Sequence, residues 1–414
     1  MNATLIKMGQ RAQAAEQKLM LLDTATKNQA LLQMAQALLN NKDKIIAANR
    51  IDMENAVAMP KKFTDRLLIN ESRIDDMANG LKTVAQLPDP IARIDKGWYT
   101  ADGLQILQKR VPLGVIGIIF EARPNVTVDA AALTFKSGNA VILRGGKEAL
   151  HTNAALANIL RQSLEDQDLP KDSVQLITDT SHETAGELMH LNDYLDVLIP
   201  RGGRGLIQRV VKTATVPVIE TGAGNCHIYV DKDARLEMAQ AIVVNAKVQR
   251  PSVCNAAEKL LIHQDVADAY LPVLAKSLQA HGVQLRGDER ACAIVSGMQP
   301  ATKEDWDTEY NDLIMAVKVV DSFDDAVKHI NAHSTHHSEA IITDDLERGQ
   351  AFLNQINSAC VYVNASTRFT DGGQFGFGAE IGISTQKLHA RGPMGLDQLT
   401  TIKYQIIGNG QIRH

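Results

Sequence analysis

The chain has 414 residues, which is too long for one ordinary core and predicts two or three domains. Apolar residues make up 45% of it and charged residues 22%, as in soluble globular proteins. The net charge of -5, with both signs interspersed, argues against a nucleic acid or a membrane surface as the main partner.

The four cysteines indicate a reducing compartment. They are far apart in the chain and follow neither a metal-ligand nor a disulfide spacing: Cys226, Cys254, Cys292 and Cys360. The first residues, Met1–Leu22, are polar, and no segment approaches the ~18 uninterrupted apolar residues of a membrane span. We therefore expect a cytoplasmic protein.

The sequence predicts helices up to about residue 90. Within this part, Asn28–Ile51 places its apolar residues on one broad face, which is typical of an amphipathic helical segment. Residues 98–110 then predict a β-hairpin with a turn at Ala101–Gly103.

Short apolar runs next alternate with helical segments. Strands are predicted at 114–120, 140–143, 174–177, 197–199, 217–219 and 227–230, and helices begin near Val126, His182 and Gly205. Unbroken apolar runs of this kind indicate parallel strands covered on both faces, hence an open, doubly wound α/β domain. A second α/β unit is predicted from about 240 to 364, with strands at 259–262, 315–320, 340–343 and 361–364.

Cys254 is the strongest candidate for a reactive side chain. It follows a Pro251–Ser252 turn and a predicted short helix over 241–247, with Lys247 and Arg250 nearby. A thiolate is a strong nucleophile only where its surroundings lower its pKa, and backbone N–H groups and cations do this. The alternative is a small buried hydrophobe, because free cysteine is among the most buried residue types.

A glycine-rich turn at Leu198–Gly205 could hold the phosphates of a cofactor. It lies where a strand is predicted to end and a helix to begin, so Gly202 and Gly203 could present backbone N–H groups to a pyrophosphate. The alternative is a plain tight turn. Neither G-x-G-x-x-G after a strand nor a Walker A sequence is present.

A second such turn follows the strand predicted at 140–143. It contains Gly145 and Gly146 between two cations, Arg144 and Lys147, which could pair with a phosphate. Two solvated charges at a strand end are the alternative.

A group of histidines invites a metal hypothesis: His329, His333, His336 and His337. They have no nearby acidic or cysteine ligands at zinc-like spacing, so no metal site is predicted.

Several long segments together resemble a known family. They are Val111–Val128, Lys136–Glu148, Ile199–Gly203, Gly224–Asp231, Asn245–Asn255, Val361–Gly373 and Gln386–Gly395. In this order they are similar to the γ-glutamyl phosphate reductases (glutamate-5-semialdehyde dehydrogenases) of the aldehyde dehydrogenase superfamily. The resemblance covers nearly the whole chain.

The resemblance implies an aldehyde dehydrogenase-like α/β fold with three parts. A Rossmann-type, NADPH-binding domain would comprise residues 1–95 and 113–228, and an α/β catalytic domain residues 229–394. A small oligomerisation flap would be formed by the hairpin at 96–112 and the tail at 395–414. A homo-oligomer is therefore expected.

The resemblance also implies roles for single residues. Cys254 matches the catalytic cysteine, and Asn125 matches the asparagine that, with the Cys254 backbone N–H, polarises the substrate carbonyl. Five cations within the matching segments are candidates for binding an anionic substrate, although some of them could be structural: Arg123, Arg250, Arg368, His389 and Arg391.

The implied cofactor is NADPH. Arg144 stands where the superfamily has a lysine on the adenine ribose, and Lys147 stands where NAD-preferring members often have a glutamate. A cation there should favour a 2′-phosphate, unless Lys147 simply faces solvent. Glu309 is similar to the glutamate on the nicotinamide ribose, or else is a surface carboxylate.

The implied reaction is the NADPH-dependent reduction of L-glutamyl 5-phosphate to L-glutamate 5-semialdehyde and phosphate through a Cys254 thioester. This is the second step of proline biosynthesis from glutamate, and transient contact with glutamate 5-kinase is plausible. Two alternatives stay open. One is a hydrolytic, NAD-dependent aldehyde dehydrogenase, which Glu220 at the position of the water-activating base would favour. The other is a catalytically silent scaffold.

Overall fold

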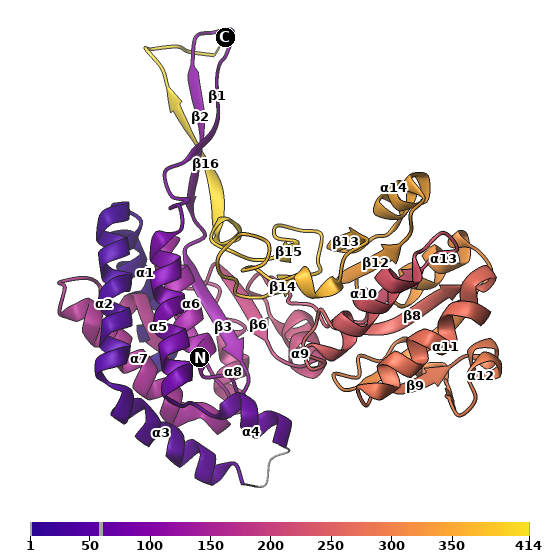
Figure 1. Cartoon of the computed structure of the whole chain (residues 1–414). Helices are drawn as coiled ribbons and strands as arrows, with labels where there is room; N and C mark the ends of the chain where they lie inside the picture. The colour runs from indigo at the N-terminus through magenta and orange to yellow at the C-terminus, as the bar shows by residue number, and fades with distance from the viewer. Residues whose placement is uncertain (1, 58–60, 414) are drawn as a thin grey trace. The chain divides into compact units, whose positions relative to one another are not determined.

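The computed structural model describes residues 2–57 and 61–413 (Figure 1). Its contacts divide the chain into two compact units. Unit 1 comprises Met1–Glu220, Gly376–Gly382 and Met394–His414, and unit 2 comprises Thr221–Phe375 and Ile383–Pro393. The boundary predicted at residues 228 and 229 would cut through strand β7 (Cys226–Val230), whereas the structure keeps β7 whole within the sheet of unit 2.

Unit 1 begins with helices, as the pattern up to residue 90 predicts. Their bounds are α1 (Ala3–Leu19), α2 (Thr24–Asn40), α3 (Lys42–Asn55), α4 (Lys61–Leu67) and α5 (Glu71–Gln86). Side chains of Asn2, Asp23 and Asn70 cap the starts of α1, α2 and α5 by accepting backbone N–H groups. The segment 28–51 is broken at Asn41, whose side chain donates to the Ala37 carbonyl at 2.8 Å.

The sheet of unit 1 has four parallel strands in the order β5-β4-β3-β6. Their bounds are β3 (Val115–Phe120), β4 (Ala140–Arg144), β5 (Val174–Leu176) and β6 (Val197–Arg201). Every residue of β3 is buried, which confirms the prediction of a strand covered on both faces. The strand predicted at 217–219 is reduced to a single bridge between Val218 and Leu198.

Four further helices of unit 1 connect and cover these strands. They are α6 (Asn125–Lys136), α7 (Leu150–Glu165), α8 (His182–Leu188) and α9 (Arg204–Thr213), with short 3₁₀ turns at Lys147–Ala149, Lys171–Ser173 and Asp397–Leu399. One face of the sheet packs on α1, because Leu5 and Ala12 share a buried cluster with Val115 and Ile142.

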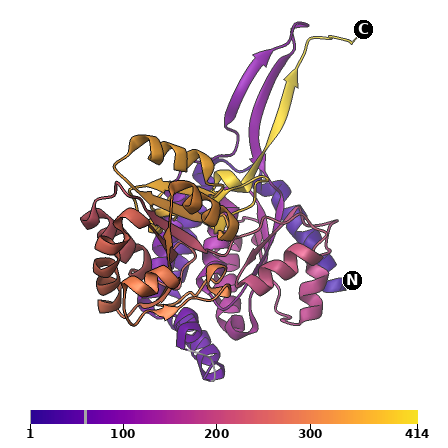
Figure 2. The ribbon, with the colours of Figure 1, turned by 90° about the vertical axis from the view of Figure 1, so that its right-hand side faces the viewer.

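A three-stranded antiparallel arm extends from the rest of unit 1 (Figures 1 and 2). It consists of β1 (Ile94–Tyr99), β2 (Gln105–Pro112) and β16 (Thr400–Ile407), in the order β1-β2-β16. The hairpin predicted at 98–110 is confirmed, and the C-terminal segment pairs with it along the full length of β16. All of β1 and seven residues of β16 are exposed.

Unit 2 is built on a seven-stranded parallel sheet in the order β10-β9-β11-β8-β7-β12-β13. Besides β7, its strands are β8 (Ala257–His263), β9 (Gln284–Gly287), β10 (Gln299–Pro300), β11 (Ile314–Val320), β12 (Ser338–Ile342) and β13 (Cys360–Val363). The four strands predicted between 259 and 364 are β8, β11, β12 and β13, so the second α/β unit is confirmed.

The helices of unit 2 are α10 (Leu236–Val248), α11 (Gln264–Ala280), α12 (Glu289–Ile294), α13 (Phe323–His333) and α14 (Leu346–Gln355). Short 3₁₀ turns lie at Glu304–Trp306 and Thr367–Phe369, and β14 (Ile383–Ser384) pairs with β15 (Gly392–Pro393). Helices α10 and α11 share a buried apolar cluster with β7, β8 and β11. None of the helices in the described ranges combines the length and apolarity that crossing a membrane requires.

Candidate active site

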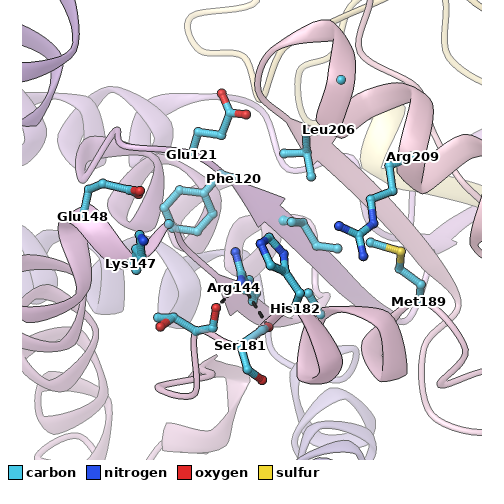
Figure 3. A pocket seen from close by; sticks show the side chains of 15 residues that line it. Phe120, Glu121, Arg144, Lys147, Glu148, Ser181, His182, Met189, Leu206 and Arg209 are labelled. Atoms are coloured by element: carbon cyan, nitrogen blue, oxygen red, sulfur yellow. Dashed lines mark hydrogen bonds between the residues drawn. The ribbon is translucent and has the colours of Figure 1, made fainter. Parts of the chain in front are cut away.

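One cavity of unit 1 lies where the order of the strands in its sheet reverses. The chain runs from β3 to β4 and β5 on one side and then returns to place β6 on the other side of β3. In open α/β sheets, ligands bind outside the carboxyl ends of the strands at such a point. A cavity of about 550 Å³ lies there, lined by the ends of β3 and β4, the loop before α8, and α8 and α9 (Figure 3).

Arg144 lies in this cavity at the end of β4. Its Nη2 donates to the backbone carbonyls of Thr180 at 2.6 Å and Ser181 at 3.3 Å. Burial lowers the pKa of Arg144 from its usual value, but a guanidinium titrates so high that the group stays charged. The loop before α8 therefore holds a fixed positive charge in the cavity. Lys147, three residues further on, lines the same cavity and is exposed.

The turn between β6 and α9 already binds an anionic oxygen. The backbone N–H of Gly203 donates to Oε2 of Glu121 at 2.9 Å. A Cβ on Gly202 would lie 2.6 Å from Cδ of the same carboxylate, so a larger residue there would displace the Glu121 side chain. An anion next to the first turn of a helix is stabilised by free N–H groups and the helix dipole. This donor set therefore suits the pyrophosphate of a dinucleotide.

The cavity is also lined by two side chains to which the sequence analysis gave no role. Arg209 from α9 and His182 from the start of α8 both line it (Figure 3). Arg144, Lys147 and Arg209 thus give the cavity three cations, while Glu121 and Glu148 are its two carboxylates.

Cys254 lies in unit 2, in the loop between α10 and β8. The two ends of this loop are joined by an ion pair between Lys247 Nζ and Glu258 Oε2, 2.9 Å apart and fully buried. Burial raises the pKa of Glu258 to about 7 and lowers that of Lys247, and the pairing opposes both shifts. The charge of Lys247, which the sequence places near Cys254, is thus engaged with Glu258.

The peptide that follows Cys254 is held on several sides. The Cys226 thiol donates to the carbonyl oxygen of Cys254, with 3.2 Å between Sγ and O. Asn255 Nδ2 donates to the Thr370 carbonyl at 2.7 Å, and the Thr367 hydroxyl donates to the Asn255 carbonyl at 2.7 Å. The Cys254 residue itself is partly exposed, which suits a nucleophile.

Two of the predicted substrate cations lie close to this loop. Arg368 Nε donates to Gln249 Oε1 at 3.0 Å. Burial is the main cause that lowers the pKa of Arg368, and Arg250 and Cys254 also act on it electrostatically. The structure therefore brings Arg250 and Arg368 together with Cys254 within unit 2.

Comparison with known proteins agrees with this geometry. The model of the aldehyde dehydrogenase family matches residues 2–306 and 304–404. A gamma-glutamyl phosphate reductase from Limosilactobacillus reuteri (strain DSM 20016) is 74% identical over 413 residues, covering 100% of both chains. The chain belongs to the gamma-glutamyl phosphate reductase family, within the aldehyde dehydrogenases. The crystal structure of the gamma-glutamyl phosphate reductase from Thermotoga maritima has a TM-score of 0.97 and 48% identity, covering 99% of this chain and 100% of that one.

The other predicted site residues of this aldehyde dehydrogenase lie in distinct settings. Arg391 Nη2 donates to the carbonyl and the side chain of Asn357, at 3.1 and 3.2 Å. His389 is exposed in a left-handed backbone conformation with φ of 60°. Glu309 Oε1 accepts the Gly224 N–H at 2.8 Å. Arg123 and Asn125 belong to unit 1, where they flank Pro124 at the start of α6.

Sequence reasoning missed several residues that the structure adds. Glu121 and Cys226 both lie inside the segments that resemble the family, but their contacts join residues 82 and 28 positions apart. Thr180, Ser181 and Arg209 lie outside the motifs that the sequence analysis identified. Their positions depend on strand order, which a single sequence does not show.

The histidines of the metal hypothesis are packed among aromatic rings. His329 contacts Trp306 edge-to-face and His333 at a tilt, with ring centroids 5.3 and 4.4 Å away. Burial lowers the pKa of His329 to about 2, so its ring stays neutral. In the described part of the chain, no group of three or more potential ligand side chains could hold a metal ion.

Proposed function

We propose that this chain reduces L-glutamyl 5-phosphate to L-glutamate 5-semialdehyde and phosphate with NADPH, in the second step of proline biosynthesis from glutamate. The observation that carries the proposal is the 74% identity, over the whole of both chains, to a gamma-glutamyl phosphate reductase. The loop around Cys254, which hydrogen bonds and an ion pair hold in place, and the cation-lined cavity of unit 1 support the same chemistry.

Cys254 is the nucleophile in this proposal. Its thiolate attacks the γ-carbonyl carbon, the C–S bond forms, and the C–O bond to phosphate breaks, leaving a thioester and inorganic phosphate. Asn125, in unit 1, is the predicted side-chain donor to the developing oxyanion, a type of contact worth about 3 kcal/mol. After reduction, the hemithioacetal releases the aldehyde and returns the thiolate to Cys254.

The residues of the unit 1 cavity fit a dinucleotide. When bound, NADPH supplies the hydride that reduces the acylated cysteine. We assign Arg144, which the loop before α8 holds in place, to the adenosine ribose, and the Gly203 N–H to the pyrophosphate, where it would exchange Glu121 for a phosphate oxygen. Lys147 and Arg209 are the cations that we assign to the 2′-phosphate. Glu309 stays a predicted contact of the nicotinamide ribose.

The substrate carries a phosphate and an α-carboxylate, so it requires cations. Arg250 and Cys254 both act electrostatically on Arg368, and the two arginines are the candidates that we favour. For Arg123, His389 and Arg391, a role in substrate binding stays a prediction.

The arm of unit 1 supports self-association. Its exposed apolar residues include Trp98, Tyr99, Tyr404, Ile406 and Ile407, with exposed fractions up to 70%. Exposed apolar surface of this kind marks a protein interface. We propose that the arm joins copies of this chain into a homo-oligomer. Contact with glutamate 5-kinase and a cytoplasmic location stay predictions.

Trapping the acylated cysteine tests the proposal. The enzyme is mixed with L-glutamyl 5-phosphate generated in situ, without NADPH, and intact-protein mass spectrometry follows the adduct. We expect a glutamyl adduct on wild-type protein and none on Cys254→Ala. An adduct that persists in the variant, or none on either protein, contradicts a Cys254 thioester.

A further inference from the structure

The start of β7 lies against the backbone of Cys254. A Cβ built on Gly224 would lie 1.4 Å from the Cys254 carbonyl oxygen, so no residue other than glycine can occupy this position without moving the nucleophile loop. Two residues later, the Cys226 thiol donates to the same oxygen at 3.2 Å. One carbonyl is therefore packed by Gly224 and hydrogen-bonded by Cys226.

The segment Gly224–Cys226 is itself rigidly anchored. Glu309 accepts the Gly224 N–H at 2.8 Å, and the Thr335 hydroxyl accepts the Asn225 N–H at 2.9 Å. The Asn225 side-chain amide donates to the carbonyls of Trp306 and His333, both at 2.8 Å. Every one of these partners belongs to unit 2, and Gly224 and Asn225 are buried. Such a segment can serve as a fixed support.

The far side of the same peptide is also fixed. Asn255 is tied to Thr367 and Thr370 by its carbonyl and its side chain. Rotation about the Cα–C bond of Cys254 would swing its carbonyl, and Cys226 and Asn255 hold the two ends of that peptide group. These contacts hold the peptide group next to the Cα atom that carries the nucleophilic side chain.

We propose that Cys226 is a positioning residue that fixes the nucleophile Cys254 through a thiol-to-carbonyl hydrogen bond. This inference rests on the proposed function, in which Cys254 attacks the substrate. Cys226 touches no reacting atom. It acts on the backbone of the residue that does, and a catalytic group displaced by ~1 Å can lose ~100-fold in rate.

The chemistry of Cys226 suits this role. Burial raises the pKa of its thiol well above the ordinary value, so the proton stays available for donation. Nδ1 of His337 also lies near this thiol, but at 3.9 Å from Sγ it is further away than the Cys254 oxygen. A fully buried, protonated thiol is also a poor nucleophile, which separates Cys226 from Cys254 in function.

The test compares three variants of the full-length protein. Cys226→Ala removes the donor, and Cys226→Ser keeps one. Cys292→Ala is the matched control, because the Cys292 thiol also donates to a backbone carbonyl, that of Gly287 at 3.3 Å. Alkylation of Cys254 by iodoacetamide is measured between pH 6 and 9 by mass spectrometry of its peptide, alongside kcat and KM.

We expect Cys226→Ala to slow Cys254 alkylation and to lower kcat by about tenfold, with KM values nearly unchanged, because misplacement acts on the reacting group. Cys226→Ser should recover most of the alkylation rate and of kcat, and Cys292→Ala should match the wild-type protein in both. The proposal would be overturned if Cys226→Ala kept the wild-type alkylation rate and kcat. It would also be overturned if Cys292→Ala lost as much of both as Cys226→Ala does. If Cys226→Ala does not fold, Cys226→Ser is compared with Cys226→Val, which has no donor. Equal losses of Cys254 alkylation and kcat in these two variants would also overturn the proposal. Alkylation needs no substrate, so it reports on positioning even if the proposed reaction fails.

Discussion

The side-chain amide of Asn125 donates to the carboxylate of Asp129 at 2.9 Å, one turn further along α6. Residues four apart on a helix face each other, so this contact follows directly from the helix. An amide nitrogen has two hydrogens. One bond to Asp129 orients the group and leaves the second hydrogen for another acceptor, as the predicted oxyanion role of Asn125 requires.

Asp129 predicts a pH dependence. Burial raises the pKa of its carboxyl to about 6, while Asn125 and Arg201 oppose the shift. Above pH 6 a carboxylate accepts from Asn125, and below it the carboxyl is protonated and holds the amide less firmly. We expect kcat/KM of Asp129→Asn, relative to wild type, to rise as pH falls from 7 to 5. A ratio that is flat with pH contradicts this role.

The same pKa shift predicts an effect on stability. The folded-state pKa lies above the unfolded value, so the folded state holds a proton that the unfolded state loses between about pH 4 and 6. Asp129 therefore favours folding below that window and opposes it above. Asp129→Asn should raise the free energy of unfolding more at pH 7.5 than at pH 4.5. Denaturant titration at both pH values checks the sign.

Cofactor preference should depend on the two cations assigned to the 2′-phosphate. Lys147→Glu and Arg209→Gln should each weaken NADPH binding by about tenfold while changing NADH binding little, because a hydrogen bond to a charged group is worth ~1.5–3 kcal/mol. Fluorescence titration gives both dissociation constants. Lys212→Glu is the control, since Lys212 is exposed on α9 but does not line the cavity. Equal losses for NADPH and NADH would remove these residues from the 2′-phosphate.

The buried pair of Lys247 and Glu258 should be strongly coupled. Glu258→Gln leaves the Lys247 charge uncompensated and should cost ~3–5 kcal/mol of stability, whereas Lys247→Met combined with Glu258→Gln should recover much of it. Trp306 lies in unit 2, and its fluorescence in a Trp98→Phe background reports on that unit. Additive losses in the double variant would show that the two groups are independent.

The arm should control assembly. Ile406→Arg places a charge on a strand residue that is 60% exposed, and we expect the sedimentation coefficient to fall toward that of a smaller species. Leu346→Arg makes the same change at an exposed position of α14, outside the arm, and should leave assembly unchanged. Sedimentation velocity measures both, and an unchanged oligomer in Ile406→Arg would contradict the proposed role of the arm.

Local patterns in the sequence are sufficient for most elements of this fold. β3 and β4 are unbroken apolar runs that end in polar or glycine-rich turns, so both strands could be predicted. The break at Asn41 falls in a run of five polar residues, Asn40–Lys44, which alone does not distinguish a helix end from a solvated helix face. The segment 217–219 has the composition of a strand, but only Val218 finds a partner.

The site depends on contacts between distant residues. The rule that ligands lie at the carboxyl ends of parallel strands locates the cavity of unit 1. Cys254, however, precedes β8 and lies against the residues that begin β7, at the amino ends of both strands. Its support by Cys226 and the placement of Glu121 on Gly203 require the strand order of each sheet. Neither follows from any spacing in the sequence.

The most direct test of the central claim is the reverse reaction. L-Glutamate 5-semialdehyde and NADP⁺ are supplied with and without inorganic phosphate, and NADPH formation is followed for wild type and Cys254→Ala. The account predicts NADPH only when both phosphate and Cys254 are present. NADPH formed without phosphate would contradict it and would indicate a hydrolytic aldehyde dehydrogenase in which Glu220 activates water.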